Sequence, residues 1–303
     1  MIGAKAGHIL TRKGTRYRGS AIKGYERVLN LHVLPALGDR RISDLKRSAV
    51  QGWIDALVAS GADPSTISNA LDPLRRICDR AVKRDLIPFS PCQHLDVPRA
   101  RGRRERIASP VEAAALIAAL PTEDKALWAT FMYSGLRVSE ARALRWTDVD
   151  LDSNVFRVQR TWTDDGGEED GTKSGWDAHR IVAIIPELRP LIVAHMLATG
   201  RRGDDLVFGR TARLPLVRST VRNRAVRAWK RAGLNAIQPH ECRHSFGSLL
   251  AAAGVNAGER QRQMGHASSA MMDRYTHGFD GSVTEAGERV QRFIDTYREE
   301  AAG

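Results

Sequence analysis

The sequence is poor in cysteine and contains no long apolar segment. Its three cysteines, Cys78, Cys92 and Cys242, are scattered, so they form neither the closely spaced pairs of a zinc site nor a disulfide framework. No apolar run approaches the roughly 18 residues of a membrane-spanning helix. Residues 1–20 are basic but lack the apolar core and cleavage site of a signal peptide. These absences argue against a secreted disulfide-rich protein and a membrane protein, and we expect a cytoplasmic protein.

The chain also lacks internal repeats and low-complexity tracts, and it is short of acidic residues. Its 303 residues include 47 Lys and Arg against 35 Asp and Glu, which leaves a formal charge of +12. A polyanion is a natural partner for such a surface, because each neutralised phosphate releases a condensed counterion. Charge alone is about equally consistent with a protein that is merely soluble and basic.

The apolar pattern divides the chain into two domains, each long enough to bury its own core. Behind a tail of residues 1–20, residues 21–98 carry apolar side chains at helical spacing and predict a small bundle of three or four short helices. Within this bundle a helix should begin at Pro64. Asp72-Pro73 interrupts that helix, which predicts either a kink or a fresh helix start capped by Asp72.

A basic linker is predicted at residues 99–108, where prolines give way to arginines. The arginines of this stretch are Arg99, Arg101, Arg103, Arg104 and Arg106. Arginine-rich runs are often solvated, disordered joints. Between two domains of a basic protein, we favour a strap that binds the phosphate backbone of a nucleic acid.

The second domain, residues 109–303, should be mostly helical with a small antiparallel sheet. Ser109 as the cap and Pro110 as the first residue predict a helix start. Strands are expected at 155–160 and 180–184, with 164–171 as an acidic hairpin loop. The expected helices are 110–120, 123–134, 138–144, 188–199, 218–232, 241–253, 259–264, 269–277 and 284–299.

The strongest local motif follows Pro239, which predicts a helix start. A helix there places His240, Arg243 and His244 within one turn, where a guanidinium and imidazole donors suit a phosphate. Taken alone, such a cluster is more often a surface or capping arrangement. The spacing of the two histidines would also suit zinc, but no third ligand is evident, so no metal site is predicted.

Other candidates are weaker when taken singly. Arg137 follows a glycine at a predicted helix start and could bind a phosphate together with backbone amides, or form an ion pair with Glu140. Lys173 lies on the predicted hairpin, where an exposed, inert lysine is the ordinary interpretation. His266 follows Gly265, and Tyr275 comes nine residues later, where a half-buried packing role would be usual.

The order and spacing of these residues resemble the tyrosine recombinase family, which includes phage integrases and Xer-type recombinases. The matching set is Arg137, Lys173, His240, Arg243, His266 and Tyr275. The helical unit resembles the core-binding domain of that family, and residues 109–303 resemble its catalytic domain. Departures are Cys242 and Met264 in place of more usual leucines, and a longer, more acidic stretch before Lys173.

The resemblance implies a chemistry. Tyr275 would attack a DNA phosphate to give a 3′-phosphotyrosyl link, with Arg137 and Arg243 neutralising the charge that builds on the phosphate. His240 and His266 would donate hydrogen bonds, and His240 is also a candidate base for Tyr275. Lys173 would protonate the departing 5′-oxygen. No metal, ATP or other cofactor is expected.

The resemblance also implies partners: double-stranded DNA held by both domains, and a homotetramer on paired DNA sites, with 284–299 as a docking helix or an intramolecular packing helix. An accessory directionality factor and a further N-terminal arm-binding domain are common in the family. The expected task is integration or excision of mobile DNA. The alternatives are a nicking-closing enzyme of the type IB topoisomerase kind, and a non-catalytic DNA-binding protein on the same fold.

Overall fold

The computed structural model describes residues 6–11, 14–17, 19–99, 106–164, 167–170 and 179–265. The chain divides into two compact units, Met1–Arg104 and Glu105–Gly303, which are considered separately. Several predictions fall outside the described residues. These are the site residues Lys173, His266 and Tyr275, the linker residues Arg101, Arg103 and Arg104, and the predicted helices 269–277 and 284–299.

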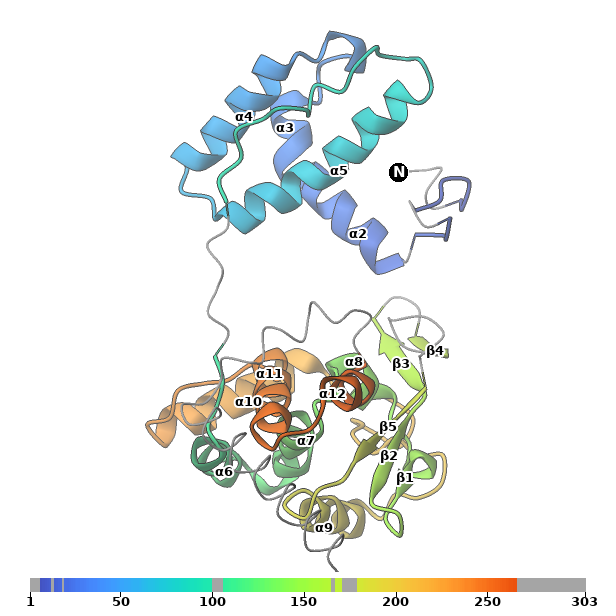
Figure 1. The fold of residues 1–303 in the computed structure, drawn as a ribbon, viewed down its shortest axis with the longest axis vertical. Coiled ribbons are helices and arrows are strands. Elements are labelled where there is room, and N and C mark those ends of the chain that lie inside the picture. The colour runs from blue at the N-terminus through green and yellow to red at the C-terminus, as the bar shows by residue number, and fades with distance from the viewer. Residues whose placement is uncertain are drawn as a thin grey trace, which may run out of the picture. The chain divides into compact units, whose positions relative to one another are not determined.

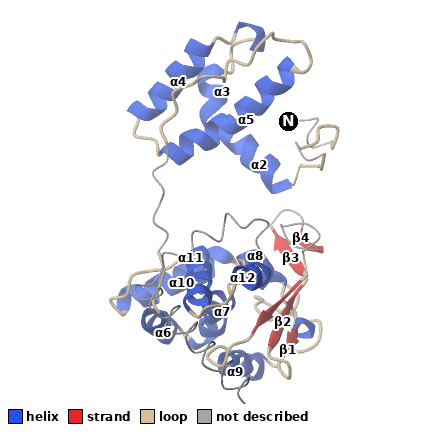
Figure 2. Cartoon of the chain, in the orientation of Figure 1, coloured by secondary structure: helices blue, strands red, loops and turns tan. Residues whose placement is uncertain are grey.

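The first unit is helical throughout its regular elements (Figures 1 and 2). Its core is built from apolar side chains between residues 29 and 92, with Val50, Ile54, Ile67 and Leu71 completely buried. The elements are α2 (Gly19–Val28), the π-helical turn η1 (Leu29–Val33), α3 (Leu34–Leu37), the 3-10 turn η2 (Ile42–Asp44), α4 (Arg47–Ala59) and α5 (Pro64–Val82). The predicted helical bundle is therefore present.

Helix α5 passes through Pro73 without ending. Its cap is Asp63, whose carboxylate accepts a hydrogen bond from the Ser65 backbone N–H at 2.8 Å. The expectation of a fresh helix start capped by Asp72 is wrong, because Asp72 lies inside the helix and binds Tyr25 Oη and Arg76 Nε, each at 3.0 Å. Pro73 is buried in the apolar face of α5, and this burial acts against the roughly 3 kcal/mol that an interior proline costs.

The second unit combines helices with two small antiparallel sheets (Figure 2). In the three-stranded sheet β2 lies between β1 and β5, with Phe156 opposite Val182, while β3 and β4 pair separately. The elements are α6 (Pro110–Ala118), α7 (Thr122–Ser134), α8 (Val138–Ala143), η3 (Trp146–Asp148), β1 (Val149–Asp150), β2 (Val155–Val158), β3 (Arg160–Thr163), β4 (Gly167–Asp170), β5 (Arg180–Ala183), α9 (Arg189–Thr199), α10 (Arg218–Arg231), α11 (Pro239–Ala252) and α12 (Ala257–Met264). The predicted fold, mainly helical with a small antiparallel sheet, is confirmed.

The acidic hairpin differs from the prediction. The segment 164–171, expected to be a loop, contains strand β4, which pairs with β3. Glutamate is unfavourable in strands. Here arginines compensate, since Glu168 binds Arg145 Nη2 at 2.6 Å and Arg160 Nε at 3.2 Å. Arg145 lies 23 residues before Glu168 and Arg160 lies on the paired strand β3, so the pattern within residues 164–171 alone does not reveal the strand.

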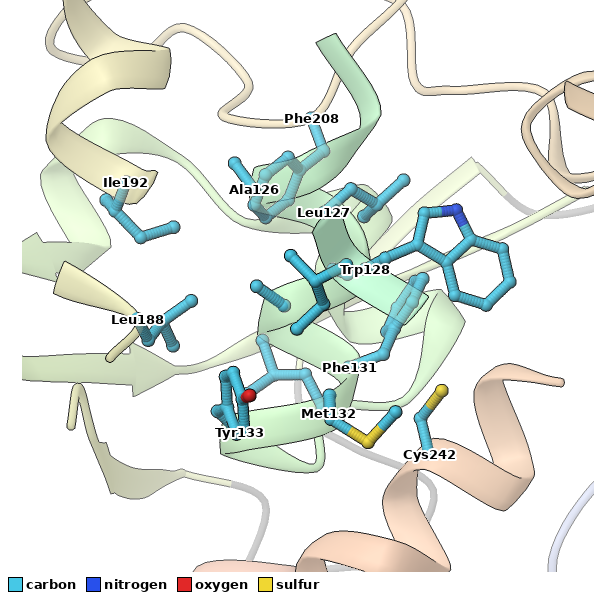
Figure 3. Close-up of a cluster of buried hydrophobic side chains, with 14 of the residues drawn as sticks. Ala126, Leu127, Trp128, Phe131, Met132, Tyr133, Leu188, Ile192, Phe208 and Cys242 are labelled. Carbon is cyan, nitrogen blue, oxygen red and sulfur yellow. The ribbon is translucent and has the colours of Figure 1, made fainter. Parts of the chain in front are cut away.

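Helix α7 forms the centre of the second unit. Its residues 126–134 are all buried, and side chains of α9, α11 and the segment before α10 surround it (Figure 3). The indole of Trp128 meets that of Trp229 edge to face at 4.7 Å between ring centroids, and Trp229 Nε1 donates to the Leu116 carbonyl at 2.8 Å. In the described part of the chain, none of the helices has the length and apolar character needed to cross a bilayer.

Candidate active site

The predicted motif after Pro239 lies in the first turn and a half of α11. The helix begins at Pro239, and the Gln238 N–H is bound by the Glu241 carboxylate at 2.8 Å. His240 is exposed, whereas Arg243 is only 3% exposed. The Nε2 atoms of His240 and His244 lie 2.9 Å apart. A hydrogen bond at that distance needs one donor and one acceptor, so one of the two Nε2 atoms carries no proton and accepts.

A sharp turn between α7 and α8 brings the first predicted arginine to the same region. Gly135 ends α7 with a φ of +60°, and a Cβ on it would lie 2.6 Å from Phe246 Cδ1 of α11, so only glycine fits. Its carbonyl accepts a hydrogen bond from Arg243 Nη1. Arg137 follows two residues later and caps α8. The turn therefore links Arg137 to Arg243 through the backbone.

A buried carboxylate holds Arg137. Glu140 is 1% exposed, and it accepts hydrogen bonds from the backbone N–H and from Nη1 of Arg137, both at 2.8 Å. The ion pair suggested by the sequence is thus present, and it orients the guanidinium.

Arg180 is the second partner of Glu140, and no sequence motif indicates its role. It stands at the start of β5, is almost completely buried, and donates through Nη1 and Nη2 to the two carboxylate oxygens at 2.9 and 2.7 Å. Sequence reasoning placed it only in a strand. Its partner lies 40 residues away in the chain, and no local motif joins the two.

These charges set the ionisation of Glu140. Burial raises the pKa of its carboxyl, but the hydrogen bonds and charge of Arg180 and the charges of Arg137 and Arg243 outweigh burial and lower it to about 2. Glu140 is therefore ionised at neutral pH. One carboxylate facing three guanidinium groups leaves a net positive cluster, which favours an anion.

The C-terminal end of α12 supplies carbonyl acceptors for the three arginines of this cluster. Arg180 Nε donates to the Gln263 carbonyl and Arg137 Nη2 to the Gly265 carbonyl, both at 2.8 Å, while Arg243 Nη2 donates to the Met264 carbonyl. The last carbonyls of a helix have no intrahelical partner and carry partial negative charge, so guanidinium groups suit them. His266 is the next residue in the chain.

The two described linker arginines differ. Arg99 is exposed. Arg106 instead donates to the Ala236 carbonyl at 2.8 Å and forms an ion pair with Glu112. Arg106 thus joins the start of the second unit to the segment before α11. DNA binding by the linker arginines stays a prediction.

Comparison with family models identifies both parts of the chain. Residues 106–281 match the model described as "Phage integrase family", and residues 10–58 match "Phage integrase, N-terminal SAM-like domain". The first match alone covers more than half of the chain.

Curated relatives are similar over most of the chain. The putative prophage phiRv2 integrase of Mycobacterium tuberculosis is 28% identical over 94% of this chain and 76% of its own length. The integrase of Streptomyces ambofaciens is 30% identical over 80% of this chain and 67% of its own. The tyrosine recombinase XerC of Xanthomonas campestris is 27% identical over 80% of this chain and 73% of its own length.

Solved structures share the fold. The Tn1549 transposon integrase in complex with transposon right end DNA superposes with a TM-score of 0.76 at 20% identity, covering 95% of this chain and 98% of that one. A lambda integrase dimer bound to a core site gives a TM-score of 0.66 at 16% identity, covering 88% of this chain and 91% of that one. From the family matches, the chain belongs to the phage integrase family and is a tyrosine-type site-specific DNA recombinase.

Proposed function

We propose that the chain cuts and rejoins duplex DNA through a covalent link to Tyr275. The Tyr275 oxygen attacks phosphorus, the bond from phosphorus to the 5′-oxygen breaks, and a 3′-phosphotyrosyl link and a 5′-hydroxyl result. The link conserves the energy of the phosphodiester bond. The 5′-hydroxyl of another strand can therefore reverse the step and join a new partner.

The observation that carries this proposal is the convergence of Arg137 and Arg243 on the end of α12. Both guanidinium groups are fixed by protein acceptors, and the cluster is positively charged overall. Fixed donors of this kind stabilise the additional negative charge of a pentacoordinate phosphate without needing to reorganise during the reaction. His266 follows directly in the chain and would add a further donor.

Proton transfer is assigned to the remaining predicted residues. Tyrosine has an ordinary pKa of about 10, so Tyr275 needs a base. His240 is exposed, and its Nε2 atom lies 2.9 Å from that of His244; we assign its imidazole as this base. Lys173 would protonate the departing 5′-oxygen.

Double-stranded DNA is the proposed partner, and both units would contribute to its binding. The Tn1549 and lambda relatives were solved in complex with DNA. The first unit, with the SAM-like match, would be the core-binding domain at 21–98, joined by the linker 99–108 to the catalytic domain at 109–303. Assembly as a homotetramer on paired sites, docking through 284–299 and help from an accessory directionality factor complete the proposal.

Covalent capture on DNA tests the function directly. Wild-type protein, Tyr275→Phe and the control Tyr17→Phe are incubated with fragmented genomic DNA of the source organism, denatured with detergent, and the protein-linked fragments are sequenced. We expect adducts on 3′ ends, clustered at one inverted repeat, from the wild type and Tyr17→Phe only. Adducts that persist in Tyr275→Phe would refute the assignment of the nucleophile. Dispersed adducts would indicate a nicking-closing enzyme.

The arginine assignments have their own test on the captured site. Replacing Arg243 by Ala should slow adduct formation about 10²- to 10³-fold, as removal of one preorganised donor does in other enzymes. Arg243→Lys keeps the charge but not the two-pronged geometry, and should stay well below wild type. Equal rates for Arg243→Ala and wild type would contradict the phosphate-binding role.

A further inference from the structure

Three arginines bind three consecutive carbonyls at the end of α12. Arg180, Arg243 and Arg137 donate to the carbonyls of residues 263, 264 and 265 in that order. Arg137 and Arg243 already have a proposed role on the phosphate. Arg180 has none, although all three of its guanidinium nitrogens donate hydrogen bonds to Glu140 or α12.

The donors of Arg180 are directed at protein groups. Nη1 and Nη2 bind the two oxygens of Glu140, and Nε binds the Gln263 carbonyl, all between 2.7 and 2.9 Å. Its side chain is 5% exposed. Each of its three guanidinium nitrogens donates to Glu140 or to α12, so we assign Arg180 a role through these partners rather than on the substrate. Any influence on the reaction acts through these two partners.

Both partners of Arg180, Glu140 and the end of α12, are connected to residues with a proposed role in the reaction. Glu140 binds the backbone and the side chain of Arg137, so its position sets the position of that guanidinium. The end of α12 accepts from Arg137 and Arg243, and the chain that leaves it at Gly265 carries His266 and Tyr275. Arg180 is the one residue among these contacts that joins Glu140 to α12 without a role of its own on the phosphate.

The backbone at this point is adapted to Arg180. Gly265 has a φ of +58°, and a Cβ there would lie 3.1 Å from Arg180 Cδ and 3.2 Å from Arg180 Nη1. Any larger residue would be strained by its backbone and would also press on the guanidinium. The glycine thus lets Arg180 pack directly under the end of the helix.

We propose that Arg180 is a positioning residue for strand cleavage, which fixes Arg137 through Glu140 and fixes the end of α12 through the Gln263 carbonyl. The proposal rests on the proposed function. The positioning role requires the planar guanidinium with its three donor nitrogens. A lysine ammonium cannot bind both oxygens of Glu140 and a carbonyl in the same planar arrangement.

The test compares Arg180→Lys and Arg180→Met with the wild type, using a nicked duplex that carries the site recovered by covalent capture. Arg189→Lys is the matched control, since Arg189 is an exposed arginine at the start of α9 that binds Asn154 at 2.8 Å. Single-turnover adduct formation, DNA affinity and thermal melting are measured for each protein.

We expect Arg180→Lys to slow adduct formation by about 10- to 100-fold, the range seen when an orienting partner behind a metal ligand is removed. Its Kd for the duplex should change less than about threefold, since the proposal places Arg180 behind Arg137 rather than on the DNA. Arg189→Lys should behave as wild type. If Arg180→Met does not fold, Arg180→Lys still decides, because it retains the buried charge.

The pH profile separates positioning from general loss of structure. In Arg180→Lys, Glu140 loses guanidinium donors that keep it ionised, so its pKa rises. The acidic limb of the rate profile should therefore move to higher pH in this variant. Gly265→Ala should cause a similar rate defect. In the double variant, the fold loss in rate should be smaller than the product of the two single losses.

The outcomes are distinguishable. Wild-type rate and pH profile in Arg180→Lys, with adducts forming normally in the wild type, would overturn the positioning role and leave the proposed function intact. A slower rate explained entirely by weaker DNA binding would also overturn it. Absence of adducts from the wild type would overturn both proposals.

Discussion

Glu140 shows how a single buried carboxylate affects stability. Its folded-state pKa of about 2 lies below the ordinary value of 4.5, so the unfolded chain takes up the proton first as pH falls. The stability that Glu140 contributes is therefore complete above pH 4.5 and is lost as pH falls from there through about 2. The shift corresponds to ~3 kcal/mol at neutral pH.

Glu140→Gln should accordingly be less stable than wild type near neutral pH, and the difference should shrink as the solution becomes more acidic. The amide offers one acceptor oxygen where the carboxylate offers two, and it lacks the charge that Arg180 and Arg137 bind. Denaturant unfolding at a series of pH values measures the difference. A gap between the two proteins that stays constant from about pH 6 to about pH 3 would show that ionisation of Glu140 is not the source.

The site residues divide by how far away their partners lie in the chain. Arg137, His240 and Arg243 could be predicted because each belongs to a short motif, with a helix start beside it. Arg180 could not, since its meaning depends on a carboxylate 40 residues earlier and a carbonyl 83 residues later. Lys173, His266 and Tyr275 lie outside the described residues, and the catalytic roles of all six predicted residues stay predictions.

Helix α7 is held at its start by an ion pair to another helix. Asp124 is 2% exposed and binds Arg224 of α10 through both oxygens, at 2.8 and 2.6 Å. Arg224 itself is 43% exposed, so the attraction is partly screened. The larger effect comes from leaving Asp124 buried without its partner.

Arg224→Ala should therefore lower the free energy of unfolding by about 1–3 kcal/mol. Arg227→Ala, an exposed arginine one turn further along α10, should change it by less than about 0.5 kcal/mol. Chemical denaturation monitored by tryptophan fluorescence suits the measurement, because Trp128 and Trp229 lie in the same core. In a background of Asp124→Asn the cost of Arg224→Ala should fall, and an unchanged cost would contradict this account.

Among the elements, helices were predicted more accurately than strands. The expected ranges 123–134 and 218–232 match Thr122–Ser134 and Arg218–Arg231 closely, because the apolar spacing of a helix is contained within it. Strand β4 was missed because the charge of its Glu168 is compensated by Arg145 and Arg160, which belong to other elements. The continuity of α5 through Pro73 was likewise decided by packing, which local sequence does not contain.

The formal charge of +12 makes binding of the whole protein to DNA sensitive to salt. Each phosphate neutralised contributes about −0.9 to the slope of log K against log salt concentration. Arg99 is exposed and Arg106 is engaged with Glu112 and Ala236, so the two arginines should respond differently to substitution.

Arg99→Ala should make the salt slope shallower by about 1. Arg106→Ala should instead lower the melting temperature and leave the slope nearly unchanged. Fluorescence anisotropy of a labelled duplex in increasing NaCl, with melting curves of the same preparations, makes the comparison. A shallower slope for Arg106→Ala at unchanged melting temperature would place Arg106 on the DNA rather than in the fold.

The two main cores share no residue, and this has a consequence for synthesis of the chain. The first core is complete by Val97, whereas the second needs residues as late as Cys242. At roughly 5–20 residues per second, a ribosome takes on the order of 10 seconds to cover that interval. Helical units fold within microseconds to milliseconds. We therefore expect the N-terminal unit to be folded on the ribosome long before the segment that carries α11 has been translated.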